Sequence, residues 1–292
     1  MSKALVLGAA FVDVVINVPR LPFSGGDVTG ELKSYRVGGS AFNVYGALRH
    51  ASQVANLFVP VGAGQYADRV RSHLISKNIP LSLAVNGADN GWDLSLVEPD
   101  GERSFLTIDG IEQQWDVSWF DRINMTDYQY IYVSGYEMEN PQSAQIILDA
   151  LNHKALDAYI LFDTSPRIGQ ISPNILKEIL TDHVIVHCNA DEIGQVIPSG
   201  DSLADKAQLI YSLTKSPVIV TLGGKGTYYY DGQVEETLPA EKVTVVNTIG
   251  AGDTHCGGVI AGLLAGMPLR EAIQQANQLS AQVVQQESGS LY

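Results

Sequence analysis

A short glycine turn that carries a carboxylate is the stretch of this sequence best suited to chemistry. It reads Asn247-Thr248-Ile249-Gly250-Ala251-Gly252-Asp253. A glycine turn at a helix start leaves several backbone N–H groups unpaired, and together with the helix dipole they form an anion site. A carboxylate there makes sense if Asp253 takes a proton from a nucleophile that attacks a bound phosphoryl group. The alternative is an ordinary acidic residue in a first helical turn, which the dipole also favours.

The elements around this turn are predicted from apolar runs. The run 243–246 predicts a buried strand that ends at Asn247, and 251–266 predicts a helix. Small residues at 257, 258, 261, 262, 265 and 266 would let that helix pack closely. A last helix is expected over 269–286, and it carries Asn277.

Size and composition predict a globular protein. The chain has 292 residues, of which 45% are hydrophobic, and a formal net charge of −14. This charge argues against a nucleic-acid partner, whereas a single nucleotide could still be held by local N–H groups and a metal. We expect no membrane span and a reduced, cytoplasmic setting, because Met1–Lys3 lead directly into a core-like strand and Cys188 and Cys256 form no disulfide framework.

From residue 129 onward, strands and helices alternate. Strands are expected over 130–133, 159–162, 184–186 and 218–222, and helices over 141–151, 173–180 and 202–213. This rhythm predicts a parallel sheet with helices on both faces, and in such sheets ligands bind at the carboxyl ends of the strands. Polar clusters follow these ends at 163–167, 189–192, 221–226 and 247–253.

The first third of the chain contains further β-prone segments. Strands are expected over 4–8 and 55–61, and a helix over 65–77. Shorter strands are expected within 17–37 and over 81–85, 93–97 and 103–108, with a hairpin turn at 99–102. Trp92, Trp115 and Trp119 are interpreted as packing residues.

Candidate ligand-binding residues lie in this first third and at the strand ends. Asp13 is either a strand-end acid satisfied by a turn or an acceptor for a ligand hydroxyl. Gly38 and Gly39 allow close backbone approach before a helix, and Asn43 offers a donor and an acceptor. Asp163 and Arg167 could bind substrate hydroxyls or phosphate oxygens, or form an ordinary loop salt bridge.

Two further clusters point toward phosphates and metal. Asn189 and Glu192 are three residues apart, so one helical turn would aim both at one spot, where they could act on Mg²⁺ through water; helix capping by Asn189 is the alternative. Thr221, Gly223 and Gly226 form a loop that is not a Walker A motif but could approach a nucleotide. His183 and His187 are interpreted as core or edge histidines, since no third metal ligand is apparent.

Over its whole length the chain resembles the ribokinase-like (PfkB) carbohydrate kinases, and it looks closest to uncharacterised bacterial sugar kinases. The features that carry the resemblance are Asp13, Gly38-Gly39…Asn43, Asn189…Glu192, Thr221…Gly223…Gly226 and Gly250-Ala251-Gly252-Asp253. The resemblance implies one kinase domain over 1–292: a doubly wound, mostly parallel α/β sheet flanked by helices, with a small β-sheet lid from about 13–37 and 81–108. It also leaves open a homodimer formed through the lid.

The resemblance also implies roles for single residues. Asp253 would be the catalytic base, with Gly250, Ala251 and Gly252 as its anion hole. The sugar would be held by Asp13, Gly38, Gly39 and Asn43, with Asp163 and Arg167 at the substrate end. Asn189 would face the phosphates and Glu192 the Mg²⁺, while Thr221, Gly223, Gly226 and Asn277 would line the ATP site.

Two positions depart from the family pattern. Asn247 replaces an Asp that in many members helps to bind a monovalent cation, so activation by K⁺ is in doubt. His255 replaces an aromatic residue, and we interpret it as a packing residue rather than an acid or base.

These observations predict an ATP-dependent kinase that phosphorylates a hydroxyl, a primary CH₂OH, of a sugar or sugar-like small molecule. Asp253 could serve near its reference pKa of roughly 3.9, because a loose transition state requires little basicity until late. A nucleoside kinase of the same fold, including one for pseudouridine-type substrates, is the first alternative, with a base pocket supplied by 81–108 and Trp92. A non-catalytic sugar- or nucleotide-binding regulator is the second.

Overall fold

The protein folds as two compact units, described here from a computed structural model that covers residues 3–292. Unit 1 comprises the described residues up to Gly8 together with Ser40–Phe58 and Trp115–Tyr292. Unit 2 comprises Ala9–Gly39 and Val59–Gln114. Within residues 3–292, no helix has both the length and the apolar character needed to cross a bilayer.

Unit 1 is built on an eight-stranded sheet in the order β14-β13-β12-β11-β10-β9-β1-β4. Its strands are β1 (Ala4–Leu7), β4 (Ala55–Phe58), β9 (Tyr130–Ser134), β10 (Tyr159–Asp163), β11 (Val184–Asn189), β12 (Val218–Thr221), β13 (Thr227–Tyr230) and β14 (Glu235–Leu238). Six neighbouring strands run parallel, namely β4, β1, β9, β10, β11 and β12. At the other edge, β13 and β14 add antiparallel pairings. The predicted doubly wound, mostly parallel sheet is confirmed.

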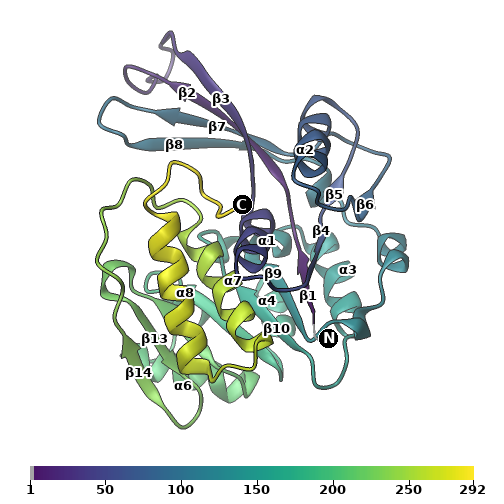
Figure 1. The fold of residues 1–292 in the computed structure, drawn as a ribbon, viewed down its shortest axis with the longest axis vertical. Helices are drawn as coiled ribbons and strands as arrows, with labels where there is room; N and C mark the ends of the chain where they lie inside the picture. Colours follow the sequence, from purple (N-terminus) through teal and green to yellow (C-terminus); the bar gives the residue numbers. More distant parts are fainter. Residues whose placement is uncertain (1–2) are drawn as a thin grey trace. The chain divides into compact units, whose positions relative to one another are not determined.

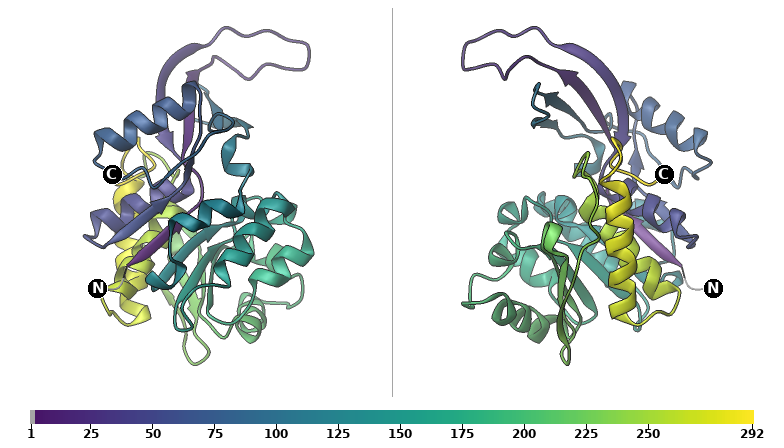
Figure 2. Two further views of the ribbon diagram at one scale, coloured as in Figure 1. Left: turned by 90° about the vertical axis from the view of Figure 1, so that its right-hand side faces the viewer. Right: turned by 60° about the vertical axis from the view of Figure 1, so that its left-hand side comes forward.

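Helices cover both faces of this sheet (Figures 1 and 2). They are α1 (Ser40–His50), α3 (Pro141–Leu151), α4 (Pro173–Ile179), α5 (Ile193–Val196), α6 (Leu203–Thr214), α7 (Ala251–Leu264) and α8 (Leu269–Val283). The predicted close packing of α7 is present, since a Cβ at Gly257 would lie 2.6 Å from the Val44 carbonyl oxygen of α1 and one at Gly258 2.7 Å from Ala276 Cα of α8. Glycine therefore brings the helix that begins beside Asp253 against both neighbours.

Short 3₁₀ turns complete the connections of unit 1. They are η2 (Val117–Arg122), η3 (Met125–Asp127), η4 (Gly135–Met138), η5 (Ile168–Gln170) and η6 (Gly223–Lys225). Trp115 and Trp119 are buried here and pack on each other with ring centroids 5.5 Å apart, as the packing interpretation predicts.

Unit 2 contains the expected small sheet, in the order β3-β2-β7-β8. Its strands are β2 (Phe11–Asn17), β3 (Glu31–Gly38), β7 (Trp92–Val97) and β8 (Arg103–Ile108). The helix α2 (Gln65–Ser76), a 3₁₀ turn η1 (Ile111–Gln113) and a separate two-stranded sheet of β5 (Pro60–Val61) and β6 (Leu83–Ala84) complete the unit. The 81–85 segment therefore pairs with β5 and does not join the four-stranded sheet.

The single strand predicted over 55–61 is wrong. The segment divides at Val59 into β4, which pairs with β1, and β5, which pairs with β6. Pro60 lacks an amide hydrogen, so it cannot donate a hydrogen bond that would extend the pairing of the edge strand β4 with β1.

The buried strand predicted over 243–246 is also wrong. This segment forms no strand, and Val245 and Val246 are 56% and 58% exposed. The Val246 and Asn247 N–H groups both donate to the Val284 carbonyl oxygen, at 2.8 and 3.1 Å. The chain here is tied to the end of α8 and not to a neighbouring strand, so its apolar side chains are left in solvent.

Candidate active site

Asp253 lies in the first turn of α7, as the sequence predicts. Gly250 precedes this turn in the left-handed conformation, with φ 75° and ψ 2°. A Cβ at Gly250 would lie 1.8 Å from the Gly289 carbonyl oxygen, so the turn requires glycine twice over, for its backbone angles and for its close approach to the C-terminal segment.

Fewer backbone N–H groups are free to form the expected anion hole than the sequence indicates. The Ala251 N–H donates to the Thr248 carbonyl oxygen at 3.2 Å, so it already has a partner. Within residues 3–292, no carbonyl accepts a hydrogen bond from the Gly252 or Asp253 N–H. A Cβ at Gly252 would meet no atom within 4 Å. In the described part of the chain, two N–H groups without a carbonyl partner therefore lie at the positive end of a helix, and the side-chain direction of Gly252 is open.

The Asp253 carboxylate is held by α1. Asn43 Nδ2 donates to Asp253 Oδ2 at 2.9 Å, and Ser40 adds a second side-chain hydrogen bond. Burial and the negative charge of Asp163 raise the pKa of Asp253 to about 6, while the Asn43 and Ser40 hydrogen bonds and the charge of His187 act in the opposite direction. The expectation of a pKa near the reference value is therefore wrong, because burial outweighs the hydrogen bonds.

Three of the four predicted polar clusters begin at the carboxyl ends of neighbouring parallel strands. Asp163 ends β10, Asn189 ends β11 and Thr221 ends β12. Asn247 is different, because no strand precedes it. It is positioned instead by its own amide, which accepts from the Ile249 N–H at 3.0 Å and donates to the Glu287 carbonyl oxygen at 3.1 Å.

Asn189 and Glu192 do meet. Asn189 Nδ2 donates to Glu192 Oε1 at 2.7 Å, while Glu192 Oε2 accepts from the Thr164 hydroxyl at 2.7 Å and from the Asn189 N–H at 3.0 Å. Asn189 Oδ1 also accepts the N–H groups of Asp191 and Glu192, so the capping alternative holds as well. The buried Glu192 keeps a free lone pair on Oε1, which suits contact with Mg²⁺ through water better than direct coordination.

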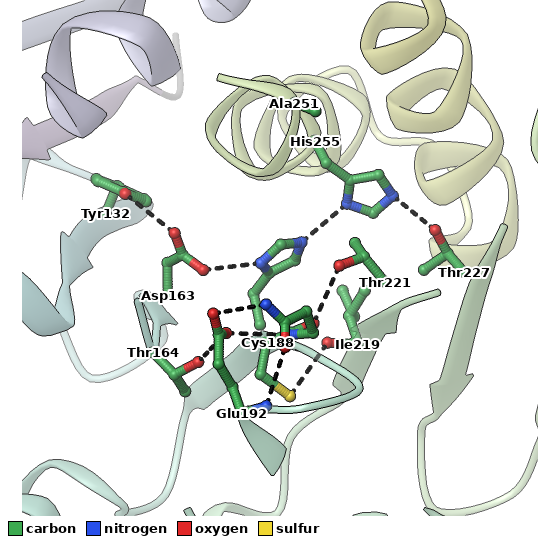
Figure 3. A network of polar contacts seen from close by, with 12 residues as sticks. Tyr132, Asp163, Thr164, Cys188, Glu192, Ile219, Thr221, Thr227, Ala251 and His255 are labelled. Carbon is green, nitrogen blue, oxygen red and sulfur yellow. Dashed lines mark hydrogen bonds and ion pairs between the residues drawn. The ribbon is translucent and has the colours of Figure 1, made fainter. Parts of the chain in front are cut away.

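A buried chain of polar contacts runs from Asp163 to His255 and Thr227 (Figure 3), and Asn277 on α8 continues it. His187 Nδ1 lies 3.0 Å from Asp163 Oδ1, and His187 Nε2 lies 3.0 Å from His255 Nδ1. His255 Nε2 lies 3.0 Å from Thr227 Oγ1 and 3.2 Å from Asn277 Oδ1. Both histidines are 2% exposed. The packing interpretation of His255 is therefore incomplete, because its ring nitrogens are hydrogen-bonded.

The role of His187 in this chain is not apparent in the sequence. His187 lies on a buried strand and His255 on a buried helix, and a periodicity argument gives both to the core. The two residues are 68 positions apart, so only the packing of α7 against the sheet joins them. His183, directly before this strand, packs against Tyr159 in a tilted arrangement with ring centroids 5.0 Å apart and has no part in the chain of polar contacts.

The expected nucleotide-binding residues remain within unit 1. Thr221 Oγ1 donates to the Cys188 carbonyl oxygen at 3.4 Å, and Gly223 and Gly226 flank the short turn η6. Asn277 accepts from the Thr227 hydroxyl at 2.7 Å and donates to the Pro239 carbonyl oxygen at 3.3 Å.

Arg167 forms a loop salt bridge, which was the alternative to substrate binding. Its Nη1 lies 3.3 Å from Glu139 Oε2, and its guanidinium lies 5.4 Å from the ring centroid of Tyr136. Asp163 does not pair with Arg167 in this arrangement. Its carboxylate is hydrogen-bonded to His187 and to the Tyr132 hydroxyl, the latter at 3.5 Å.

Unit 2 contains the remaining expected sugar-binding residues. Asp13 on β2 lies directly opposite Asp93 on β7, and their carboxyl groups are hydrogen-bonded. Burial raises the pKa of Asp13 to about 6, while burial and the neighbouring Asp13 raise that of Asp93 to about 8. The two carboxyl groups therefore share one proton at neutral pH, a pairing that residue type and spacing do not predict. Gly38 borders Asp13 Oδ2, which a Cβ would approach to 3.0 Å.

Gly39 follows in unit 2 with φ 101°. A Cβ there would lie 2.7 Å from the Ala9 carbonyl oxygen. Glycine is thus required at this position, as close backbone approach predicts.

The chain is similar in sequence and in fold to known proteins. Residues 1–291 match the family described as pfkB family carbohydrate kinase. The chain is 33% identical over 299 residues to the uncharacterized sugar kinase YegV of Escherichia coli (strain K12), covering 99% of this chain and 90% of that protein.

Two solved structures share the fold. Ribokinase from Thermotoga maritima superposes with a TM-score of 0.83 at 17% identity, covering 99% of this chain and 94% of that one. Ribokinase from Cryptococcus neoformans var. grubii serotype A in complex with ADP gives 0.78 at 22% identity, covering 100% and 96%. With a family match over essentially its whole length, the chain belongs to the pfkB family of carbohydrate kinases, phosphotransferases that act on a hydroxyl group.

Proposed function

We propose that this protein transfers the γ-phosphoryl group of ATP to a primary CH₂OH of a sugar or sugar-like small molecule. The observation that carries the proposal is Asp253, a buried carboxylate beside two unpaired N–H groups at the start of α7. A base and an anion site side by side are the two elements that phosphoryl transfer to an alcohol requires.

Asp253 accepts the proton of the attacking hydroxyl. The amide of Asn43 holds the carboxylate in one orientation. The N–H groups of Gly252 and Asp253 stabilise the charge on the transferring phosphoryl group, with Gly250 fixing the turn that presents them. The Ala251 N–H contributes less, because it is bound to Thr248.

The two ends of the site take different ligands. The acceptor is held by Asp13, Gly38, Gly39 and Asn43, with Asp163 and Arg167 as further contacts. ATP lies along Asn189, Thr221, Gly223, Gly226 and Asn277. Glu192 would hold Mg²⁺ through water, and the ion would supply positive charge beside the phosphate oxygens.

A substrate panel tests this proposal. The full chain, with ATP and Mg²⁺, is assayed for ADP release against hexoses, pentoses, their 1-phosphates, polyols, sugar acids and nucleosides. We expect turnover with one class of sugar that disappears when the primary hydroxyl is replaced by hydrogen. ATP binding without phosphorylation of any panel member would instead support the non-catalytic regulator.

A nucleoside kinase is the second candidate because of an aromatic pair in unit 2. Trp92 stacks on Tyr66 with ring centroids 5.0 Å apart and an interplanar angle of 17°. Such a surface can stack a nucleobase. Faster turnover of nucleosides than of free sugars, lost in Trp92→Leu, would favour this candidate over the first.

We further propose a homodimer formed through the four-stranded sheet of unit 2, because this sheet exposes Leu32, Phe105 and Leu106. Sedimentation of the wild-type protein and of Phe105→Lys tests it, with a monomeric wild type as the contrary result.

We also propose a cytoplasmic setting, with which Cys188 and Cys256 agree because both are buried and free.

A further inference from the structure

The chain Asp163–His187–His255–Asn277 contains more hydrogen-bond contacts than two neutral histidines can fill. Each of these contacts joins two heavy atoms at hydrogen-bonding distance, so each needs one hydrogen between them. Both ends of the chain are acceptors: a carboxylate oxygen of Asp163 and the amide oxygen of Asn277. The hydrogens must therefore come from the residues between them.

The contacts of Asn277 determine which atoms donate hydrogen bonds along this chain of polar contacts. Asn277 Nδ2 donates to the Pro239 carbonyl oxygen at 3.3 Å, so the amide presents its oxygen to Thr227 and His255. The single hydroxyl hydrogen of Thr227 is used at 2.7 Å on Asn277 Oδ1. His255 Nε2 then faces only acceptors, namely the Thr227 lone pair and Asn277 Oδ1, so it must carry a hydrogen.

His187 must supply the hydrogens of the remaining two contacts. Burial holds the pKa of His255 well below its usual value, so His255 is neutral and, with its hydrogen on Nε2, its Nδ1 bears none. The 3.0 Å contact between the rings then needs a hydrogen on His187 Nε2. The contact with the Asp163 carboxylate needs another on His187 Nδ1. His187 thus carries both, and imidazole is a stronger base than the carboxylate with which it could share the extra proton.

We propose that the buried chain from Asp163 to Asn277 holds one proton more than two neutral histidines supply, and that His187 carries it as an imidazolium paired with Asp163. His187 is then a positioning residue for the proposed reaction. Its positive charge offsets that of Asp163 and keeps the carboxylate of Asp253 available as a base. This last step rests on the proposed function, whereas the held proton does not.

The surroundings of His187 are consistent with a single positive charge. The titratable groups that interact with this site are Asp163 on β10, Tyr132 on β9, Tyr136 and Glu137 on η4, Cys188 on β11, Asp253, His255 and Cys256 on α7, and Glu192 after β11. Asp163 and Asp253 are the acids that interact with both Tyr132 and Cys256, and Tyr132 and Cys256 stay neutral because burial raises the pKa of each well above its usual value. A metal ion among Asp163, His187 and Cys256 is disfavoured, because both ring nitrogens of His187 already bind protein atoms.

Nuclear magnetic resonance of the ¹⁵N-labelled, ligand-free full chain tests the held proton directly. At neutral pH we expect both ring nitrogens of His187 to be protonated, and only Nε2 of His255. A neutral His187 with a bare Nε2, or a His255 protonated at Nδ1, overturns the proposal.

A pair of variants tests the counting argument. Asn277→Leu removes the terminal acceptor and frees the Thr227 hydroxyl to donate to His255 Nε2, so the spectrum at neutral pH should show only one protonated ring nitrogen on His187. Thr227→Val is the matched control, because Asn277 Oδ1 still requires the His255 Nε2 hydrogen, and its spectrum should match that of the wild type. Equal behaviour of the two variants overturns the argument, and the wild-type spectrum remains decisive if either fails to fold.

The effect on Asp253 needs a separate measurement. In His187→Gln, the acid limb of kcat/KM should move to higher pH by about one unit, because Asp253 loses a neighbouring positive charge. His153→Gln, at an exposed position, is the control. An unmoved limb removes the tuning role. A wild type that phosphorylates nothing in the substrate panel refutes the proposed function instead, and leaves the spectroscopic result standing.

Discussion

Asn43 and Asp253 are 210 residues apart in the chain, yet Asn43 Nδ2 donates to Asp253 Oδ2 at 2.9 Å. One residue lies on α1, which follows the glycine pair of unit 2, and the other begins α7. The contact joins a proposed sugar-binding residue to the proposed base. A substrate that binds to Asn43 would therefore lie close to the carboxylate of Asp253.

Replacing Asp253 by Asn should abolish most of the turnover. The amide keeps the shape of the side chain but cannot accept a proton, and general-base contributions are typically about 10²–10⁴-fold. The measurement is kcat on the best substrate of the panel, with Asp182→Asn, an exposed acid before β11, as control. A loss below about tenfold would remove Asp253 from the role of base.

The acid limb of kcat/KM should lie near pH 6. The pKa of Asp253 is raised to about 6 by burial and by Asp163, and only the carboxylate can act as a base. Activity should therefore be full above this pH and fall about tenfold per unit below it. Because kcat/KM reports groups of the free enzyme, a limb near pH 4 would contradict the raised pKa of Asp253.

Replacing Gly250 by Ala should damage both stability and activity. The left-handed backbone alone costs roughly 1–2 kcal/mol for a residue with a side chain, and the new Cβ would also collide with the Gly289 carbonyl oxygen. Urea unfolding and kcat measure the two effects. Gly194→Ala is the matched control, because a Cβ there meets nothing within 4 Å. Wild-type values for Gly250→Ala would contradict the turn geometry.

Asn247 should make the enzyme indifferent to K⁺. Its amide carries no charge, and its oxygen accepts from the Ile249 N–H while its nitrogen donates to the Glu287 carbonyl oxygen, so the side chain is a much weaker cation ligand than a carboxylate. We expect similar rates in K⁺, Na⁺ and a bulky organic cation. Strong activation of the wild type by K⁺ would refute this.

The reverse substitution gives the complementary result. In Asn247→Asp, a carboxylate oxygen would face the Glu287 carbonyl oxygen without a hydrogen between them, at a cost of about 1–3 kcal/mol. A cation between the two oxygens would relieve this, so the unfolding midpoint of the variant should rise in K⁺ while that of the wild type stays constant. Equal midpoints of the variant in all three salts would be the contrary outcome.

The Asp13–Asp93 pair should make the protein less stable as pH rises. Both pKa values are raised in the folded state, to about 6 and about 8, so between roughly pH 4 and 8 the folded chain binds more protons than the unfolded chain. The free energy of unfolding therefore falls with increasing pH across this range. Asp93→Asn keeps a donor for Asp13 but removes the titration, so its urea midpoint should depend less on pH.

Asp27→Asn, an exposed acid of the same unit, is the control for this series. If Asp93→Asn and the wild type lose stability in parallel from pH 6 to 8, the two carboxyl groups do not share a proton.

Local patterns determined much of this protein. Apolar runs alternating with amphipathic segments predicted the strands from β9 to β12 and the helices α3, α4 and α6, because short-range periodicity reflects which side of an element is buried. Glycine and Asp253 at the start of α7 were likewise apparent from residue type alone. The same reasoning failed at 243–246, where an apolar run has no strand to pair with.

Tertiary structure decided what the polar residues do. Two hydrogen-bonded pairs join residues that are far apart in the sequence. Strand register brings Asp13 to Asp93, and helix packing brings His255 to His187. Protonation follows from that proximity and from burial, which is why the pKa of Asp253 could not be foreseen. A sequence specifies which groups can titrate, whereas the fold specifies the charges and the low-dielectric surroundings that set where they do.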